Sequence, residues 1–271
     1  MRTVFIVNPK AGKGQGREKF IAEIEAASEK TGVPVEIYST QGSGDGEILA
    51  AQLAQEAEVR GEETRIIACG GDGTLNEVLN GAMHHAHVVI GVVPIGTGND
   101  FCRNFPEAGD FLDIEAQLTG TVMDCDAIRY SGMLDGRVQT RYCANMFNIG
   151  FDCNVVDLTA KLKTYPLLAG SMAYLMAVLC ILVRKKGADL RVELDGEVYE
   201  DGPVLLTALA NGSFCGGGVK SAPTARLDDG LMDVNIIYNV SRREFLSKFP
   251  AYSKGTHMQL PGIEKIIFAR Q

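Results

Sequence analysis

Residues 69–81 read CGGDGTLNEVLNG, and they follow the apolar run RIIA, so that glycines and an aspartate stand at the end of a predicted strand. A strand, a tight glycine turn and the start of a helix form an anion-binding site, because glycines let backbone N–H groups approach phosphate oxygens. Gly70, Gly71 and Gly73 fit that need, and Thr74 is placed to cap the helix that follows. Asp72 would repel phosphate, so its expected partner is a Mg²⁺ ion or a bridging water.

Two more glycine-rich segments follow predicted strands. VNPKAGKGQGR comes after the first strand and PIGTGNDFCR after the fourth. Neither is a P-loop, and neither has the G-x-G-x-x-G spacing of dinucleotide-binding proteins. A single glycine-rich turn is structural more often than not. Three of them at the carboxyl ends of parallel strands predict a phosphate-binding rim on one edge of a sheet.

The order of strand and helix signals predicts two domains. Up to about residue 122, buried strands such as TVFIVN alternate with helices such as GREKFIAEIEAASEKTG. This alternation predicts an α/β domain with a parallel sheet covered on both faces. After it, β-rich runs separated by Asp-Gly and Asn-Gly turns predict a mostly antiparallel β-sandwich. The expected domains are residues 1–122, which bind nucleotide, and residues 123–271.

Composition excludes several classes of protein. The net charge of −8 over 271 residues argues against bulk binding of nucleic acid, which needs a basic surface. The seven cysteines have irregular spacings and form no CxxC, so we expect reduced thiols and a cytoplasmic protein. The N-terminal apolar run is broken too early by Asn-Pro for a signal peptide.

The longest uncharged apolar stretch, LLAGSMAYLMAVLCILV at residues 167–183, is slightly too short for a spanning helix. We interpret it as a buried or half-buried helix, with a lipid-contacting surface helix as the alternative. The sequence therefore predicts no transmembrane span.

The three glycine-rich motifs together resemble those of the diacylglycerol kinase catalytic-domain family, which includes soluble bacterial diacylglycerol kinases and is related to sphingosine and ceramide kinases. The downstream segment ANGSFCGGGVKSAPTARLDDGLMDV resembles the second domain of that family. GGDGT alone is shared with NAD kinases, whereas GTGNDF beside GGDGTLNE is more specific to the lipid kinases. The resemblance implies transfer of the γ-phosphate of ATP to a lipid hydroxyl, with conversion of diacylglycerol to phosphatidate as the expected reaction. An NAD-kinase-like enzyme and a non-catalytic nucleotide- or lipid-binding regulator stay open as alternatives.

The resemblance also implies a set of site residues. ATP would lie between the two domains, and its lining would include Asn8, Pro9, Lys10, Ala11, Gly12 and Thr40. Its phosphates would be held by Gly70, Gly71, Asp72, Gly73, Thr74, Leu75, Asn76 and Thr97, with Asp72 organising Mg²⁺. A structural Mg²⁺ would bind the carbonyls of Arg226 and Leu231 and the carboxylate of Asp229, with the alternative that Asp228, Asp229 and Gly230 form only a hairpin turn. The lipid substrate implies a protein peripheral to the membrane, and the family allows a homodimer.

One expected part does not match within the sequence. The resemblance places an acidic general base in a D-G-E-like segment near the C-terminus, which would lie past residue 271. The DGE at residues 195–197 has alternating flanks, so we interpret it as a hairpin turn without a catalytic role. We therefore expect a C-terminal end that is truncated, ATP binding, and weak or absent turnover, because general acid–base help is worth roughly 10²–10⁴-fold.

Overall fold

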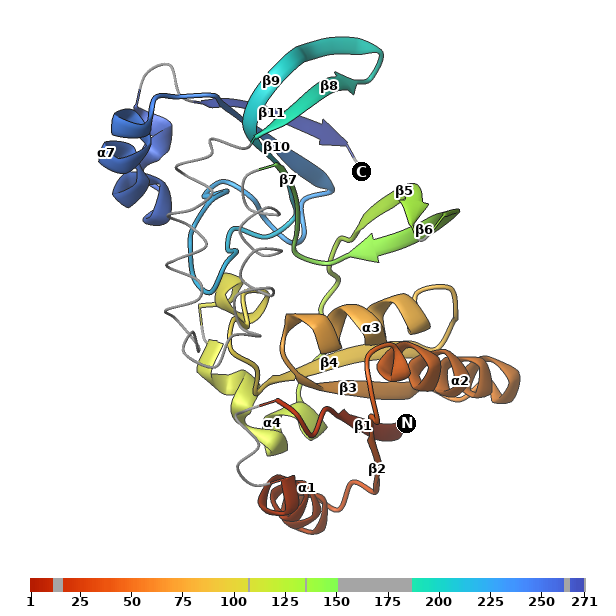
Figure 1. Ribbon diagram of the computed structural model, residues 1–271. Coiled ribbons are helices and arrows are strands. Elements are labelled where there is room, and N and C mark those ends of the chain that lie inside the picture. Colours follow the sequence, from red (N-terminus) through yellow and green to blue (C-terminus); the bar gives the residue numbers. More distant parts are fainter. Residues whose placement is uncertain (12–16, 107, 135, 151–186, 261–263, 271) are drawn as a thin grey trace. The chain divides into compact units, whose positions relative to one another are not determined.

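The structure is a computed structural model that describes residues 1–11, 17–106, 108–134, 136–150, 187–260 and 264–270 (Figure 1). It divides into two compact units, residues 1–144 with 215–218 and residues 145–214 with 219–271. The N-terminal unit thus includes the hairpin of β5 (Ile128–Leu134) and β6 (Arg137–Cys143). The expected division at residue 122 stays a prediction.

The N-terminal unit is built on a parallel sheet with the strand order β2-β1-β3-β4. Its strands are β1 (Arg2–Val7), β2 (Val35–Ser39), β3 (Thr64–Gly70) and β4 (Val88–Pro94). All three pairings in this sheet are parallel. The carboxyl ends of the four strands therefore lie along one edge, which is where the glycine-rich loops emerge.

Helices cover both faces of this sheet, because alternate residues of each strand point to opposite sides. Val4 and Ile6 pack with residues of α2 (Asp45–Arg60) and α3 (Asp72–Ala82). Phe5 and Val7 pack on the other face with α1 (Arg17–Thr31) and α4 (Ile114–Thr119). Figure 1 shows α2 and α3 on one side of the strands and α1 on the other. The continuous apolar runs of the sequence are explained by this burial on both faces.

The β5–β6 hairpin is joined to the helices by polar contacts. The Asn80 side chain donates to the Tyr142 carbonyl at 2.9 Å and accepts from the Tyr142 N–H at 2.8 Å. Arg141 makes a two-pronged ion pair with Glu47 of α2, at 2.7 and 2.8 Å. Short one-turn helices, η2 (Cys102–Asn104) and η3 (Ala108–Leu112), follow the GTGND loop.

The C-terminal unit contains an antiparallel sheet with the order β11-β10-β9-β7, and β8 also pairs with β9. The strands are β7 (Met146–Gly150), β8 (Ala188–Leu194), β9 (Glu197–Ala210), β10 (Leu231–Tyr238) and β11 (Glu264–Arg270). Val204, Val234 and Ile236 form the centre of its buried cluster. Between β10 and β11 lie α7 (Arg242–Ser253) and the short η4 (His257–Gln259). The predicted fold class, a parallel α/β domain followed by an antiparallel β-domain, is confirmed.

The DGE at residues 195–197 forms the predicted hairpin turn. Leu194 of β8 pairs with Glu197 of β9, so the loop has two residues. Asp195 and Gly196 have φ of 52° and 83°, the left-handed values that a two-residue type I′ hairpin requires. Its lack of a catalytic role stays a prediction.

Among the described residues, none of the helices has both the length and the apolar character that crossing a bilayer requires. The apolar stretch at 167–183 lies outside the described residues, so its interpretation as a helix is not addressed.

Candidate nucleotide-binding site

A pocket of about 420 Å³ lies at the carboxyl edge of the parallel sheet. It is lined by Asn8, Pro9, Lys10, Ala11, Thr40, Gln41, Gly42, Ser43, Gly71, Gly73, Thr74, Glu77 and Gly96. These residues come from the segments that follow β1, β2, β3 and β4 and from the first turns of α3. The pocket therefore brings together four of the residues predicted after the first strand, Asn8 to Ala11, with Thr40 and part of the GGDGT turn.

One side of the pocket, which we call the α3 wall, consists of Gly71, Gly73, Thr74 and Gly96. Helix α3 begins at Asp72 with Gly71 as its N-cap, and no side chain caps it. The N–H groups of Asp72 and Gly73 have no intrahelical acceptor there, as at any helix N-terminus. Such N–H groups and the helix dipole favour an anion at this position.

The prediction that Thr74 caps the helix is wrong. The helix starts before Thr74, and the Thr74 side chain is buried. Its hydroxyl accepts a hydrogen bond from Asn8 Nδ2 at 3.2 Å, although the two residues are 66 positions apart. Thr74 thus connects the turn after β3 to the turn after β1.

The turns after β3 and β4 pack backbone against backbone. The Gly96 N–H donates to the Gly70 carbonyl at 3.0 Å. A methyl group added at Gly96 would lie 2.3 Å from the Cα of Gly71 and 2.8 Å from its nitrogen. A side chain at Gly96 is therefore excluded by the protein itself.

Gly73 is different, because no heavy atom other than those of its chain neighbours and its own helix backbone lies within 4 Å of the position that its Cβ would take. Its φ is not in the left-handed region, and it sits in the first turn of α3. Glycine in a helix costs about 0.5–1 kcal/mol relative to alanine. Since neither packing nor backbone conformation requires glycine here, its open space in the pocket wall fits a ligand that approaches the backbone.

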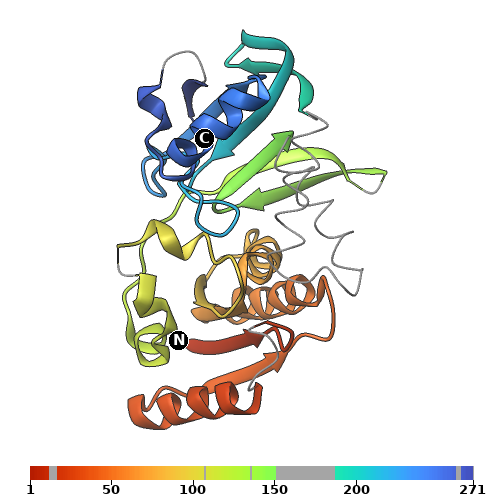
Figure 2. The same ribbon diagram turned by 60° about the vertical axis from the view of Figure 1, so that its left-hand side comes forward.

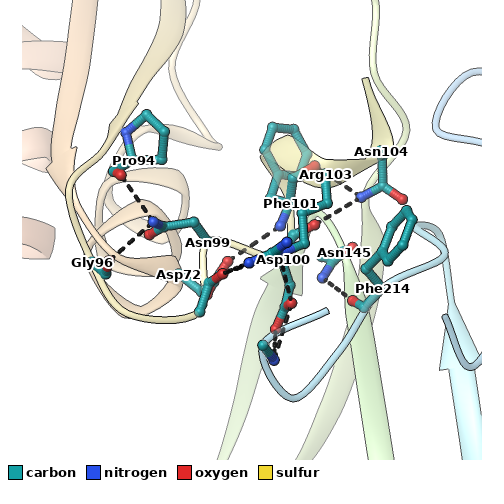
Figure 3. Close-up of polar contacts among 12 residues, drawn as sticks. Asp72, Pro94, Gly96, Asn99, Asp100, Phe101, Arg103, Asn104, Asn145 and Phe214 are labelled. Atoms are coloured by element: carbon teal, nitrogen blue, oxygen red, sulfur yellow. Dashed lines mark hydrogen bonds and ion pairs between the residues drawn. The ribbon is translucent and has the colours of Figure 1, made fainter. Parts of the chain in front are cut away.

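Asp72 points toward the GTGND loop (Figure 3). Its Oδ1 accepts from the Phe101 N–H at 3.2 Å, and a methyl group at Gly98 would lie 2.8 Å from Oδ2. Asn99, which has a φ of 54°, donates from Nδ2 to the carbonyls of Pro94 and Gly96 at 2.9 and 3.0 Å. The turn after β4 is therefore held in shape by Asn99 and is tied to α3 through Asp72.

Asp100 is only 7% exposed and accepts the Gly217 N–H at 2.9 and 3.1 Å. The pKa of Asp100 is raised, mainly because its carboxyl group is buried. The N–H groups of Gly217 and Gly218 lower this pKa, and the nearby charge of Asp72 raises it. The negative charge of Asp72 is thus close to the Asp100 carboxyl group beside the start of α3.

Another part of the pocket lining comes from the loop of residues 41–46, before and at the start of α2, which we call the α2 wall; its residues Gln41, Gly42 and Ser43 line the pocket. The Asp45 Oδ2 accepts from the N–H groups of Gln41 and Gly42 at 2.6 and 3.0 Å. Glu77 of α3 accepts from the N–H groups of Gly44 and Gly46 at 2.9 and 3.1 Å. Four backbone donors of this loop are therefore already bound by carboxylates of the same chain, and this wall does not offer them to a phosphate.

Four lining residues were missed by sequence reasoning, namely Gln41, Gly42, Ser43 and Glu77. The segment TQGSGDG follows the second predicted strand and has three glycines, so a fourth glycine-rich loop was visible in the sequence. Gly96 lines the pocket and belongs to the PIGTGNDFCR loop that the sequence placed at this rim. The neighbouring sequence does not indicate a role for Glu77, because the residues that it binds, Gly46 and Gly44, are 31 and 33 positions away.

Other predicted residues do not line this pocket. Leu75 is buried in the core between α3 and the sheet. Asn76 accepts from Asn80 through its carbonyl and side-chain oxygens, at 2.8 and 3.2 Å. Thr97 is exposed, and Gly12 lies outside the described residues. Gly70 and Asp72 adjoin the pocket in sequence without lining it. The phosphate and nucleotide contacts expected of these residues stay predictions.

The expected structural metal site lies in the C-terminal unit. Asp229 Oδ1 accepts from the Leu231 N–H at 3.0 Å, and Arg226 Nη2 lies 3.4 Å from Asp228 Oδ1. Among the described residues no group of three or more His, Cys, Asp and Glu side chains could hold a metal. The expected set has one carboxylate and two carbonyls, so it stays a prediction. The DDG turn is not a hairpin, because β10 begins at Leu231 whereas β9 ends at Ala210.

Comparison with known proteins identifies the family. The model of the diacylglycerol kinase catalytic domain matches residues 2–130, and that of the YegS C-terminal NAD kinase beta sandwich-like domain matches residues 145–270. The diacylglycerol kinase of Staphylococcus carnosus (strain TM300) is 32% identical over 99% of this chain and 82% of its own length. The diacylglycerol kinase of Bacillus subtilis (strain 168) is 30% identical over 95% of this chain and 80% of its own length.

Solved structures agree in fold. A crystal structure described as a diacylglycerol kinase from Bacillus anthracis strain Sterne is similar with a TM-score of 0.66 at 21% identity, over 99% of this chain and 83% of that chain. Another from the same strain gives a TM-score of 0.71 at 22% identity, with the same coverage. Both domain models match this chain, and the curated relatives are similar to it over nearly its whole length. The chain belongs to the diacylglycerol kinase family.

Proposed function

We propose that this chain transfers the γ-phosphate of ATP to the hydroxyl of a lipid, with diacylglycerol as the acceptor and phosphatidate as the product. The observation that carries the proposal is the pocket at the carboxyl edge of the sheet, whose α3 wall combines a helix N-terminus with the open space at Gly73. The names of the relatives support a kinase that acts on diacylglycerol. Such an enzyme meets its acceptor at a bilayer surface, so the proposal includes a cytoplasmic protein that is peripheral to the membrane.

The two walls suggest how the nucleotide is oriented. The triphosphate would lie against the α3 wall, where backbone N–H groups at the helix start favour anions. The α2 wall would receive the other end of the nucleotide, because its backbone donors are held by Asp45 and Glu77. Two carboxylates at that wall would also repel phosphate.

The acidic residues beside the α3 wall fit a divalent cation. Carboxylate oxygens are ligands that Mg²⁺ prefers. The pKa of Asp100 is raised mainly by burial of its carboxyl group and in smaller part by the nearby charge of Asp72. Asp72 would hold the ion. Bound Mg²⁺ would neutralise negative charge on the phosphate oxygens. Asn99 would keep the turn after β4 in place through its bonds to Pro94 and Gly96.

The proton of the acceptor hydroxyl needs a general base. We retain the prediction that this base is not among residues 1–271, and that the hairpin turn at 195–197 does not replace it. On that basis this chain binds ATP with Mg²⁺ but turns over slowly.

Incubation of the chain with labelled ATP, Mg²⁺ and detergent-dispersed diacylglycerol, followed by chromatography of the lipids, tests the reaction. We expect slow labelling of phosphatidate and no labelling of NAD offered instead. Full-rate formation of phosphatidate would contradict the prediction about the base. Labelled NADP would favour the NAD-kinase-like alternative, and ATP binding without any transfer to lipid or to NAD would favour the regulator.

The variant Asp72→Asn tests the site itself. Asparagine keeps an oxygen that accepts the Phe101 N–H but removes the charge. We expect the affinity for Mg-ATP, measured by calorimetry, to fall about 10- to 100-fold with little change in melting temperature. An unchanged affinity would overturn the proposed position of the triphosphate.

A further inference from the structure

Helix α7 of the C-terminal unit is unusual because none of its residues is buried. A surface helix ordinarily buries an apolar stripe against the core. The start of the helix is nevertheless fixed by its sequence, since Ser241 and Glu244 form a capping box with hydrogen bonds of 2.9 and 3.3 Å. Figure 1 shows α7 at the margin of its unit, beside the strands, and Figure 2 shows it from another side.

The aromatic residues of α7 form its inner side. The rings of Phe245 and Phe249 are stacked at 5.5 Å, and Phe249 contacts Tyr252 at 6.4 Å. Tyr252 in turn lies 4.8 Å from the buried His257 of η4. These half-buried rings attach the helix to the rest of the unit. The exposed apolar side chains of α7 take no part in this contact.

The outer side carries a second set of residues. Arg242, Leu246 and Pro250 are four residues apart, so they form one line along the helix. All three are exposed, and Leu246 is 59% exposed. Just after the helix, Lys254 is exposed and Met258 is 43% exposed. We call the exposed group Arg242, Arg243, Leu246, Pro250, Lys254 and Met258 the α7 surface.

The charge of this segment is opposite to that of the whole protein. Residues 242–254 contain the cations Arg242, Arg243, Lys248 and Lys254 and a single acid, Glu244, whereas the chain has a net charge of −8. Cations that surround exposed apolar side chains are the composition of helices that lie in the interface of an anionic bilayer. A cation near such a surface is attracted to it, and an apolar side chain such as Leu246 gains by leaving water.

We propose that the α7 surface docks on an anionic lipid bilayer, with its arginines at the lipid phosphates and Leu246 and Met258 among the upper acyl carbons. The inference rests on the proposed function for the expectation that the chain visits a bilayer. It adds which surface makes the contact and which lipid charge it selects. Attraction to anionic lipid would also hold the protein where phosphatidate, itself anionic, accumulates.

Co-sedimentation with vesicles tests this without ATP or diacylglycerol, so a failure of docking and a failure of the kinase reaction are told apart. The vesicles are phosphatidylcholine with or without phosphatidylglycerol. We expect binding that requires phosphatidylglycerol and weakens with salt. The double variant Arg242→Glu/Arg243→Glu should bind about 30-fold more weakly or worse. Leu246→Ser should weaken binding several-fold with the charge unchanged.

The matched control is Lys19→Glu/Arg60→Glu, which makes the same change of charge at two cations of α1 and α2 that are 84% and 59% exposed. It should bind vesicles almost as the original chain does. Equal loss in the control and the α7 double variant, or no loss in either, would overturn the proposal. Binding to phosphatidylcholine alone would overturn it as well. A change from dimer to monomer in Leu246→Ser, seen by light scattering, would show that a second copy of the chain covers this surface instead.

Discussion

The two walls of the pocket are both rich in glycine, yet they use it for different purposes. On the α3 wall, Gly96 allows two backbones to touch, and Gly73 leaves a space that no protein atom fills. On the α2 wall, Gly42, Gly44 and Gly46 supply N–H groups to carboxylates of the same chain. A glycine-rich loop at the carboxyl end of a strand is therefore not by itself a phosphate site, because its donors can already be bound.

The variant Gly96→Ala is the strongest test of this difference between the two walls, because we expect it to lower the free energy of unfolding most. A methyl group there would lie 2.3 Å from the Gly71 Cα, so the two turns would have to separate. Overpacking of this kind costs about 3 kcal/mol, measured as the free energy of unfolding in urea. Gly42→Ala on the α2 wall is the control, because nothing lies within 4 Å of its added methyl group. Equal stability of the two variants would mean that the turns do not touch as described.

The variant Glu77→Gln tests whether Glu77 holds the loop of the α2 wall in place. Glutamine offers one oxygen and one amide group where two N–H donors now face two carboxylate oxygens. We expect a loss of about 1–2 kcal/mol in unfolding free energy and faster hydrogen exchange at Gly44 and Gly46. Glu25→Gln on the exposed side of α1 serves as the control and should change neither quantity. Unchanged exchange at both glycines would show that Glu77 does not hold this loop.

Gly73→Ala separates the role of ligand space from that of folding. Alanine suits a helix better and meets no atom here, so the free energy of unfolding should rise by about 0.5–1 kcal/mol. Affinity for ATP should nevertheless fall, because the methyl group occupies the place of the ligand. Calorimetry and thermal melts on the same sample check both parts. A stabilised variant that still binds ATP normally would remove Gly73 from the site.

Asp45→Asn should have the smallest effect of the four. The Asp45 carboxylate holds the Gln41 and Gly42 N–H groups near solvent, and asparagine retains one accepting oxygen. We expect a loss of about 0.5 kcal/mol in thermal melts, clearly less than for Glu77→Gln. A larger loss than for Glu77→Gln would reverse the order of the two carboxylates in holding the α2 wall.

The sequence predicted what depends on neighbouring residues. The continuous apolar runs of β1, β3 and β4 indicated strands buried on both faces, and the sheet has helices on both. Asp-Gly at 195–196 indicated a hairpin, because both residues adopt left-handed φ at low cost. The motifs after the first, third and fourth strands indicated one rim, since parallel strands end on a common edge.

Only the tertiary structure decided what each polar or glycine residue does at that rim. Thr74 looked like a cap but accepts from Asn8, and Glu77 binds the start of another helix. Gly73 and Gly96 look alike in sequence, although one faces open space and the other a backbone. Local sequence determines backbone conformation and the face on which a side chain lies. The partner of that side chain depends on contacts between residues far apart in the chain, which exist only once the sheet has assembled.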